Sequence, residues 1–230
     1  MPKLLRRSPH RRITLSPGDW RLQPGDNVYM TVLGIVGPMG SGKTHVLEAL
    51  GRLGAVTIKA DDLSRELLKP GAALLEELRR VFGSRYFDDL GRLRRSELAT
   101  VIFADESARR RLNEVMYPEM MRLIRARLSG LRNDVSVGLV AIEAANLYEM
   151  GAATEVDYVL EVTASRRVRE ERIQKRDGLS IEETRRRLDA HAAAGLDENE
   201  ADFTIDTEQA AAELEARLAM LYEQLTRCGD

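Results

Sequence analysis

The stretch from Gly37 to Thr44 limits what this chain can fold into more than any other. It reads Gly-Pro-Met-Gly-Ser-Gly-Lys-Thr and fits the phosphate-binding loop pattern of a glycine, four variable positions and Gly-Lys-Thr. Glycines let the backbone turn tightly and aim successive N–H groups at phosphate oxygens. The predicted nucleotide-binding residues of this loop are Gly37, Pro38, Met39, Gly40, Ser41, Gly42, Lys43 and Thr44.

The segments on either side of the loop are those that such a loop requires. Residues 31–36 form an apolar, β-branched run typical of a buried parallel strand. Apolar residues then recur at helical spacing from Val46 to Leu53. This order predicts that the chain binds a nucleoside triphosphate, with Lys43 reaching the β- and γ-phosphates and the Thr44 hydroxyl group holding Mg²⁺.

Strands and helices alternate along the rest of the chain, which predicts an α/β protein with a P-loop nucleoside triphosphate hydrolase-like fold. Because helices separate the strands, they should form a parallel sheet with helices on both faces. The core is expected at residues 30–207, and the C-terminal segment 208–230 should pack an amphipathic helix on it. Apolar runs predict about five strands, at residues 31–36, 55–58, 135–142, 156–162 and 203–205.

A helical block lies between the second and third predicted strands. Helices are expected at residues 63–68 and 74–82, and three more between Ser96 and about Leu128. Ser96 and Asp105 are the expected N-caps of this group, and Pro118 should open its last helix. Since the block is too long for a plain crossover, we interpret residues 63–130 as a substrate-binding insertion.

The composition restricts the classes of partner. A net charge of −2 and a pI near 6.0 argue against a general nucleic-acid binder. No apolar stretch approaches the roughly 18 residues that a membrane span needs. Cys228 is the only cysteine, which suits a cytoplasmic protein. We therefore expect neither nucleic acid nor membrane as a partner, and a monomer or weak homo-oligomer.

Residues 1–29 differ from the rest of the chain because they are rich in arginine and interrupted by prolines. They could form a nucleic-acid or membrane arm, a targeting peptide, or an extension packed on the core. They lack the apolar region of a signal peptide. Because charge runs are usually solvated, we expect a basic N-terminal extension that is dispensable or merely packed.

Further residues give the chain a resemblance to a known family, the dephospho-coenzyme A kinases, over roughly Met30 to Thr207. The phosphate loop comes first, and Ala60-Asp61-Asp62-Leu63-Ser64-Arg65-Glu66-Leu67 follows it. Later markers are Gly91-Arg92-Leu93, Tyr117-Pro118, Leu147-Tyr148-Glu149, Arg176-Asp177-Gly178-Leu179-Ser180 and Ile205-Asp206. Each marker is weak alone, but their order and spacing together are specific.

The resemblance implies transfer of a phosphoryl group from ATP, with Mg²⁺, to the 3′-hydroxyl group of dephospho-coenzyme A, a step of coenzyme A biosynthesis. Asp61 matches the family's catalytic aspartate, which would accept or orient the hydroxyl proton. Arg176 matches an arginine of a lid at about residues 166–195, and Arg172 lies one helical turn before it. Glu143 would hold Mg²⁺ through water, and Thr207 lies where the family contacts adenine.

Several positions depart from the family's pattern: Lys59 replaces an aspartate, Tyr117 a histidine, Asn146 part of an apolar segment, His191 a glutamine and Thr207 an asparagine. Two explanations remain open for these changes. The contacts of a working dephospho-coenzyme A kinase have been rebuilt, or the chain has acquired another small hydroxyl acceptor, such as a nucleoside. A nucleotide-binding regulatory protein with little kinase activity is a further alternative, and GTP could replace ATP as donor.

Overall fold

The computed structural model describes residues 13–14, 30–193 and 200–226. Its centre is a parallel sheet in the order β1-β6-β5-β2-β4-β3. Five of these strands correspond to the predicted ones, and β1 is a two-residue addition from the N-terminal segment, whose other residues lie outside the described part. The strands are β1 (Ile13–Thr14), β2 (Thr31–Val36), β3 (Val56–Lys59), β4 (Leu139–Glu143), β5 (Tyr158–Thr163) and β6 (Phe203–Asp206).

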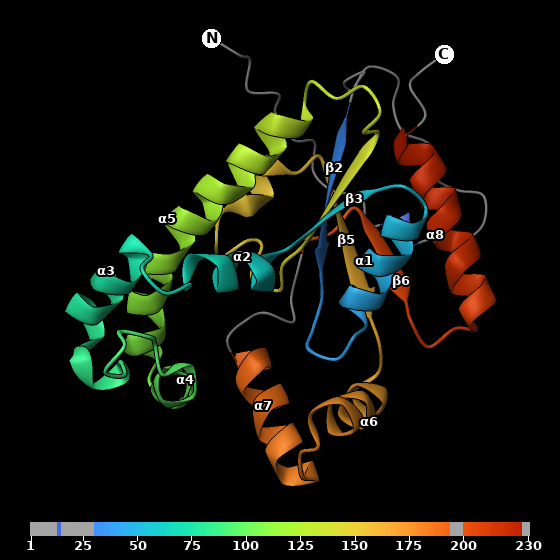
Figure 1. Cartoon of the computed structure of the whole chain (residues 1–230). Coiled ribbons are helices and arrows are strands. Elements are labelled where there is room, and N and C mark those ends of the chain that lie inside the picture. Colours follow the sequence, from blue (N-terminus) through green and yellow to red (C-terminus); the bar gives the residue numbers. More distant parts are fainter. Residues whose placement is uncertain (1–12, 15–29, 194–199, 227–230) are drawn as a thin grey trace.

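Helices cover both faces of the sheet, as predicted (Figure 1). Alternate residues of β2 point to opposite faces, so Val32 and Val36 belong to one apolar cluster and Leu33 and Ile35 to the other. The first cluster is shared with the helices between β3 and β4. The second is shared with α1 (Lys43–Arg52) and α8 (Ala211–Thr226). The strand that leads into the phosphate loop is therefore fixed from both sides.

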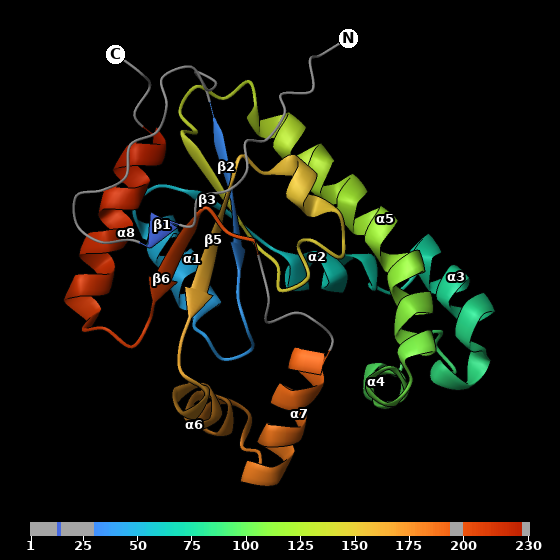
Figure 2. The same ribbon diagram turned by 180° about the vertical axis from the view of Figure 1, so that it is seen from behind.

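The insertion between β3 and β4 consists of α2 (Ala60–Leu67), α3 (Ala73–Phe82), the 3₁₀ helix η1 (Ser84–Tyr86), α4 (Arg95–Ala104) and α5 (Glu106–Leu131). Both views place it on one side of the sheet (Figures 1 and 2). Asp105 is the N-cap of α5, as predicted, and its side chain accepts a hydrogen bond from the Ser107 N–H. Ser96 is not a cap, because α4 already begins at Arg95 and Arg94 is the N-cap.

The prediction that Pro118 opens a separate helix was wrong. Pro118 lies inside α5, which runs unbroken from Glu106 to Leu131. A proline leaves the carbonyl group four residues earlier without its helical donor. Here that residue is Glu114, and both Glu114 and Pro118 are exposed, so water can replace the missing bond. The buried methionines Met116, Met120 and Met121 keep the two halves of α5 packed on one core.

Two strands begin later than expected. The third predicted strand was placed at residues 135–142, but β4 begins at Leu139, and Val135 is 87% exposed in the preceding turn. Similarly, β5 begins at Tyr158 rather than at Val156. In both cases an apolar residue of the connecting segment extended the apparent run.

Beyond β5 the chain forms α6 (Arg166–Asp177) and α7 (Ile181–Ala193). Ser165 caps α6 as predicted, and Gly178 ends it with a φ of 67°, a conformation that favours glycine. The pair lies beyond the carboxyl ends of the central strands (Figures 1 and 2). Residues 194 and 195 of the predicted lid lie outside the described part. No helix among the described residues is long and apolar enough to cross a bilayer.

Candidate active site

The phosphate loop connects β2 to α1 and has a backbone that only glycines adopt easily. Gly37, Gly40 and Gly42 have φ values of 137°, 80° and 101°. A Cβ atom on Gly37 would lie 2.2 Å from the carbonyl oxygen of Val162. The first turn of α1 has no acidic residue and no side-chain cap, so its N–H groups and dipole suit a phosphate group. The loop therefore fits the triphosphate that its sequence predicts.

Lys43 folds back over this loop. Its Nζ donates hydrogen bonds to the carbonyl oxygens of Gly37, at 2.8 Å, and of Pro38, at 3.0 Å. These bonds hold the ammonium group beside the glycine backbone, where phosphate oxygens would bind. The position agrees with the role predicted for Lys43.

Thr44 and Glu143 meet although they are far apart in the sequence. The Thr44 hydroxyl group donates to the Glu143 carboxylate, with Oγ1 2.9 Å from Oε1 and 3.2 Å from Oε2. Hydroxyl and carboxylate oxygens are ligands that suit Mg²⁺, which usually takes only one or two protein groups in nucleotide sites. Among the described residues, no group of three or more His, Cys, Asp or Glu could hold a metal ion. The Thr44–Glu143 pair therefore fits a magnesium ion shared with phosphates.

The charge of Glu143 depends on opposing effects. Partial burial raises its pKa, whereas the hydrogen bond from Thr44 and the positive charges of Lys43 and Lys59 lower it. Lys59 is the register partner of Glu143 in the β3–β4 ladder and forms an ion pair with Glu48 at 3.3 Å. The lysine that departs from the family's pattern thus lies on the strand next to the predicted magnesium ligand.

Asp61 lies in the first turn of α2, directly after β3. It is not the N-cap, a position that Lys59 occupies. Asp61 is exposed, and its carboxylate accepts no hydrogen bond from the described residues, whereas the neighbouring Asp62 pairs with Arg65 at 2.8 Å. The Asp61 charge acts on both Glu143 and Arg176. The structure therefore places an available carboxylate within electrostatic range of a metal-ligand candidate and of an arginine of the predicted lid.

Arg172 contacts the outside of the phosphate loop. Its guanidinium group donates to the carbonyl oxygens of Gly40, at 3.4 Å, and Ser41, at 3.2 Å, and to the side chain and carbonyl oxygen of Thr207, at 2.8 and 2.9 Å. The buried Thr207 hydroxyl group also lies 2.6 Å from the Ser41 carbonyl oxygen. Arg172 and Thr207 thus join α6, the end of β6 and the loop backbone in one network.

Arg176 has different partners from Arg172. It is exposed and forms a two-point contact with Asp177, at 2.7 and 2.9 Å. This hydrogen bonding raises the pKa of Arg176 and lowers that of Asp177. Arg176 is therefore a permanent cation within electrostatic range of Asp61, held by its own neighbour rather than by the loop.

Sequence reasoning missed one polar cluster. The side-chain amide of Asn146 donates to the Tyr117 hydroxyl group at 2.8 Å, and that hydroxyl group donates to Glu149 at 3.0 Å. Asn113 binds the other oxygen of Glu149 at 2.9 Å. Tyr117 and Asn146 both depart from the family's pattern, and this joint departure was the only signal in the sequence that they might be partners.

Comparisons with known proteins agree with this arrangement. The family model described as dephospho-CoA kinase matches residues 31–213. A dephospho-CoA kinase from Syntrophotalea carbinolica is 39% identical over 179 residues, which cover 77% of this chain and 83% of that protein. One from Geobacter sulfurreducens is 36% identical over 193 residues, 84% of this chain and 98% of the relative.

The fold has a similar counterpart among solved structures. The crystal structure of TT1252 from Thermus thermophilus has a TM-score of 0.67 and 29% sequence identity, and the match covers 85% of this chain and 98% of that one. The family match, in turn, includes the phosphate loop, the insertion and both helices of the predicted lid. The chain belongs to the dephospho-CoA kinase family.

Proposed function

We propose that this protein phosphorylates the 3′-hydroxyl group of dephospho-CoA with ATP and so produces coenzyme A. The observation that carries the proposal is the family match over residues 31–213. That span contains the phosphate loop, Asp61, Glu143 and Arg176. The departures from the family's pattern leave these groups in place, which supports dephospho-CoA over another acceptor.

The phosphate loop binds and orients the donor, ATP. Its N–H groups and the Lys43 ammonium group bind the phosphates, and Thr44 and Glu143 hold the magnesium ion. Mg²⁺ bound there neutralises negative charge on the phosphates. Arg172 and Thr207 fix the loop from behind by binding the Ser41 carbonyl oxygen. A fixed loop needs little rearrangement when charge develops during the transfer.

Asp61 and Arg176 act on the acceptor side. Asp61 accepts the proton of the 3′-hydroxyl group or orients that hydroxyl group for attack, and this role is supported because its carboxylate accepts no hydrogen bond from the described residues. Arg176 stabilises the charge that spreads over the transferring phosphoryl group. Since Arg176 is paired with Asp177, it exchanges or shares this partner when it reaches the phosphates. No covalent intermediate with the protein is involved.

The proposal also covers the metal ion, the location of the protein, and the roles of the insertion and the lid. Mg²⁺ is the proposed metal because both candidate ligands are oxygen atoms. We propose the cytoplasm as location, supported by the single cysteine. Residues 63–130 and 166–195 are the proposed acceptor-binding insertion and lid, and helices α6 and α7 of the latter lie at the carboxyl ends of the strands (Figure 1).

The test combines purified protein and MgATP with dephospho-CoA or with a panel of nucleosides. ADP release is followed, and the product is identified by mass and by the position of its new phosphate group. We expect turnover of dephospho-CoA and a product carrying a 3′-phosphate. Turnover of a nucleoside without turnover of dephospho-CoA would overturn the proposal. So would nucleotide binding without phosphorylation of any acceptor, the behaviour of a regulatory protein.

A further inference from the structure

The arginines of the insertion mostly have a carboxylate partner. Many of these pairs lie within one helix at spacings of three or four residues, and others join neighbouring elements. Such pairs leave little of the guanidinium group for another ligand. The paired arginines are Arg65, Arg79, Arg80, Arg92, Arg94, Arg110, Arg122, Arg125 and Arg127.

The arginines of the insertion without a carboxylate partner among the described residues are Arg85, Arg95, Arg109 and Arg111. Two of them have aromatic partners instead. The Arg85 guanidinium group lies 4.7 Å from the ring centre of Tyr86, and Arg111 lies over the Phe82 ring and donates to the Ser107 hydroxyl group at 3.2 Å. Arg95 and Arg109 have neither a carboxylate nor an aromatic partner among the described residues.

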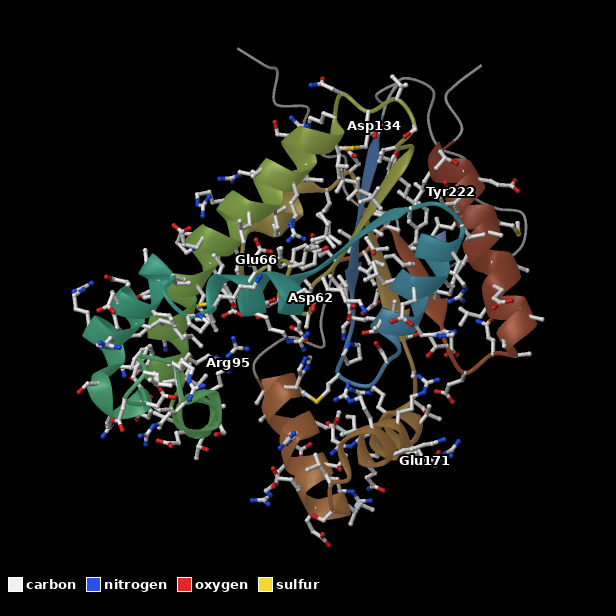
Figure 3. All side chains as sticks on the ribbon, in the orientation of Figure 1. Asp62, Glu66, Arg95, Asp134, Glu171 and Tyr222 are labelled. Atoms are coloured by element: carbon white, nitrogen blue, oxygen red, sulfur yellow. The ribbon has the colours of Figure 1, made fainter. Side chains whose placement is uncertain are left out.

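Arg95 is close to the helix that carries Asp61. Its one side-chain hydrogen bond with the described residues runs from Nη2 to the carbonyl oxygen of Leu68, at the long distance of 3.5 Å. Leu68 directly follows α2, and at the helical rise per residue it lies about 10 Å from Asp61. Figure 3 places Arg95 between α4 and α7, in the part of the molecule where the insertion faces the predicted lid. Its other donors are free to bind a ligand there.

Arg109 lies in the first turn of α5. Its Nε atom is enclosed by protein and has no hydrogen-bond partner in the described part of the chain, although an enclosed polar group without a partner is costly. Burial raises the pKa of Tyr117 and the Arg109 charge opposes this rise, so the two side chains are within electrostatic range of one another. Tyr117 in turn binds Asn146, three residues after Glu143. Arg109 therefore lies near the loop that follows the magnesium-ligand candidate.

We propose that Arg95 and Arg109 bind the diphosphate group of the acceptor. The inference rests on the proposed function, because dephospho-CoA carries its diphosphate on the same ribose whose 3′-hydroxyl group is phosphorylated. The diphosphate thus lies only a few bonds from the reacting oxygen atom, in keeping with a cation that contacts the end of α2, the helix that carries Asp61. A guanidinium group binds phosphate oxygens through two parallel hydrogen bonds, and it stays charged at every physiological pH.

The test measures binding of dephospho-CoA by calorimetry. A non-hydrolysable ATP analogue and Mg²⁺ are present, so that the phosphate loop is already filled. Arg95→Gln and Arg109→Gln should each weaken binding by roughly 10- to 100-fold, the range for a lost charge-assisted hydrogen bond. Their sequence neighbours provide matched controls. Arg94→Gln and Arg110→Gln remove the same charge from arginines that already have carboxylate partners, and both should bind as the unmodified protein does.

Two further measurements separate direct binding from a structural effect. Arg95→Lys and Arg109→Lys keep the charge but lose the planar fork, so they should bind with intermediate affinity. In steady-state assays, the KM for dephospho-CoA should rise in the Gln variants while the KM for ATP stays within about twofold of the unmodified value.

The outcomes are distinguishable. Unchanged affinity in the Arg95 and Arg109 variants, or an equal loss in the Arg94 and Arg110 controls, would overturn this inference and leave the proposed function intact. Failure of the unmodified protein to bind dephospho-CoA would overturn the proposed function itself, and the diphosphate site with it.

Discussion

The hydroxyl oxygen of Tyr117 lies 2.8 Å from the side-chain nitrogen of Asn146, which is 29 positions further along the chain. This bond joins α5 of the insertion to the loop after β4. Burial raises the pKa of Tyr117, so the phenol is neutral and can donate to Glu149 while it accepts from Asn146. Two positions that each depart from the family's pattern are therefore partners of one another.

Tyr117→Phe should destabilise the protein by about 1–2 kcal/mol, because it leaves the half-buried Asn146 amide without an acceptor. Urea unfolding measures the change. A double-mutant cycle with Asn146→Ala should give a coupling energy of roughly 0.5–1.5 kcal/mol. Tyr222→Phe is the control, since that hydroxyl group makes no hydrogen bond with the described residues. Equal stability of Tyr117→Phe and the unmodified protein would show that the hydrogen bond between Asn146 and Tyr117 does not stabilise the fold.

Asp61→Asn should lower kcat for dephospho-CoA phosphorylation by about 10²- to 10⁴-fold, because an amide cannot take up the hydroxyl proton. The melting temperature should hardly change, since the carboxylate is exposed and accepts no hydrogen bond from the residues that the structure describes. Asp62→Asn is a matched control that removes only an exposed pair with Arg65, and its rate should stay close to normal. A near-normal rate in Asp61→Asn would contradict the mechanism.

Thr207→Val should raise the KM for ATP by roughly tenfold. Valine fills the same space but cannot bind the Ser41 carbonyl oxygen or accept from Arg172, so the phosphate loop loses part of its support. Steady-state kinetics with varied ATP measure the effect. Thr204→Val, on β6 just before Thr207, removes a hydroxyl group that bonds to no described residue, and it should leave this KM unchanged. Equal KM values in the two variants would show that the network does not support the loop.

Arg176→Ala should lower kcat by about 10²- to 10³-fold while both KM values change little, because its charge is needed most when the phosphoryl group is in transit. Arg167→Ala removes an exposed arginine from the same helix, one that pairs with Glu171, and should have no such effect. The experiment compares kcat under saturating substrates. A loss confined to KM would mean that Arg176 binds substrate but does not stabilise the transition state.

Asp105→Ala should lower the melting temperature by a few degrees at pH 7, since α5 loses its N-cap. Hydrogen bonds from the Ser107 hydroxyl group and from the Ser107 and Ala108 N–H groups hold the pKa of Asp105 below its usual value. A lowered pKa stabilises the fold above the unfolded-state value of about 4, and this contribution disappears as the pH falls through the folded-state pKa.

The difference in melting temperature between the unmodified protein and Asp105→Ala should therefore shrink as the pH falls below about 4. Scanning calorimetry from pH 7 to pH 3 follows it. Asp89→Ala is the control, because that exposed carboxylate accepts no hydrogen bond from the described residues. A difference that stays constant over this range would contradict the cap's electrostatic contribution.

Much of the fold could be predicted from the sequence because local patterns determine it. The phosphate loop, the strand before it and the five principal strands follow from glycine positions and apolar runs. Sequence patterns gave the wrong helix or strand boundaries where tertiary packing outweighs local preference. Pro118 is tolerated within α5 because neighbouring turns are anchored in the core, and Val135 is apolar but exposed.

Only some of the contacts of the candidate site follow from the sequence. The pairing of Thr44 with Glu143 follows from the carboxyl-edge rule for parallel sheets. By contrast, the bond between Tyr117 and Asn146 depends on how α5 lies against the loop after β4, which no local pattern encodes. The two-residue β1 was too short to leave a periodic signal.

The hydrogen bonds from Arg172 to the carbonyl oxygens of Gly40 and Ser41 attach α6 to the phosphate loop. The part of α6 up to Arg172 should therefore move together with this loop. If the predicted lid closes over the substrates while these bonds are kept, its hinge must lie after Arg172. Gly178 ends α6 with a positive φ and is a suitable hinge about which α7 can rotate. The moving part would then be α7, with Arg176 next to the hinge.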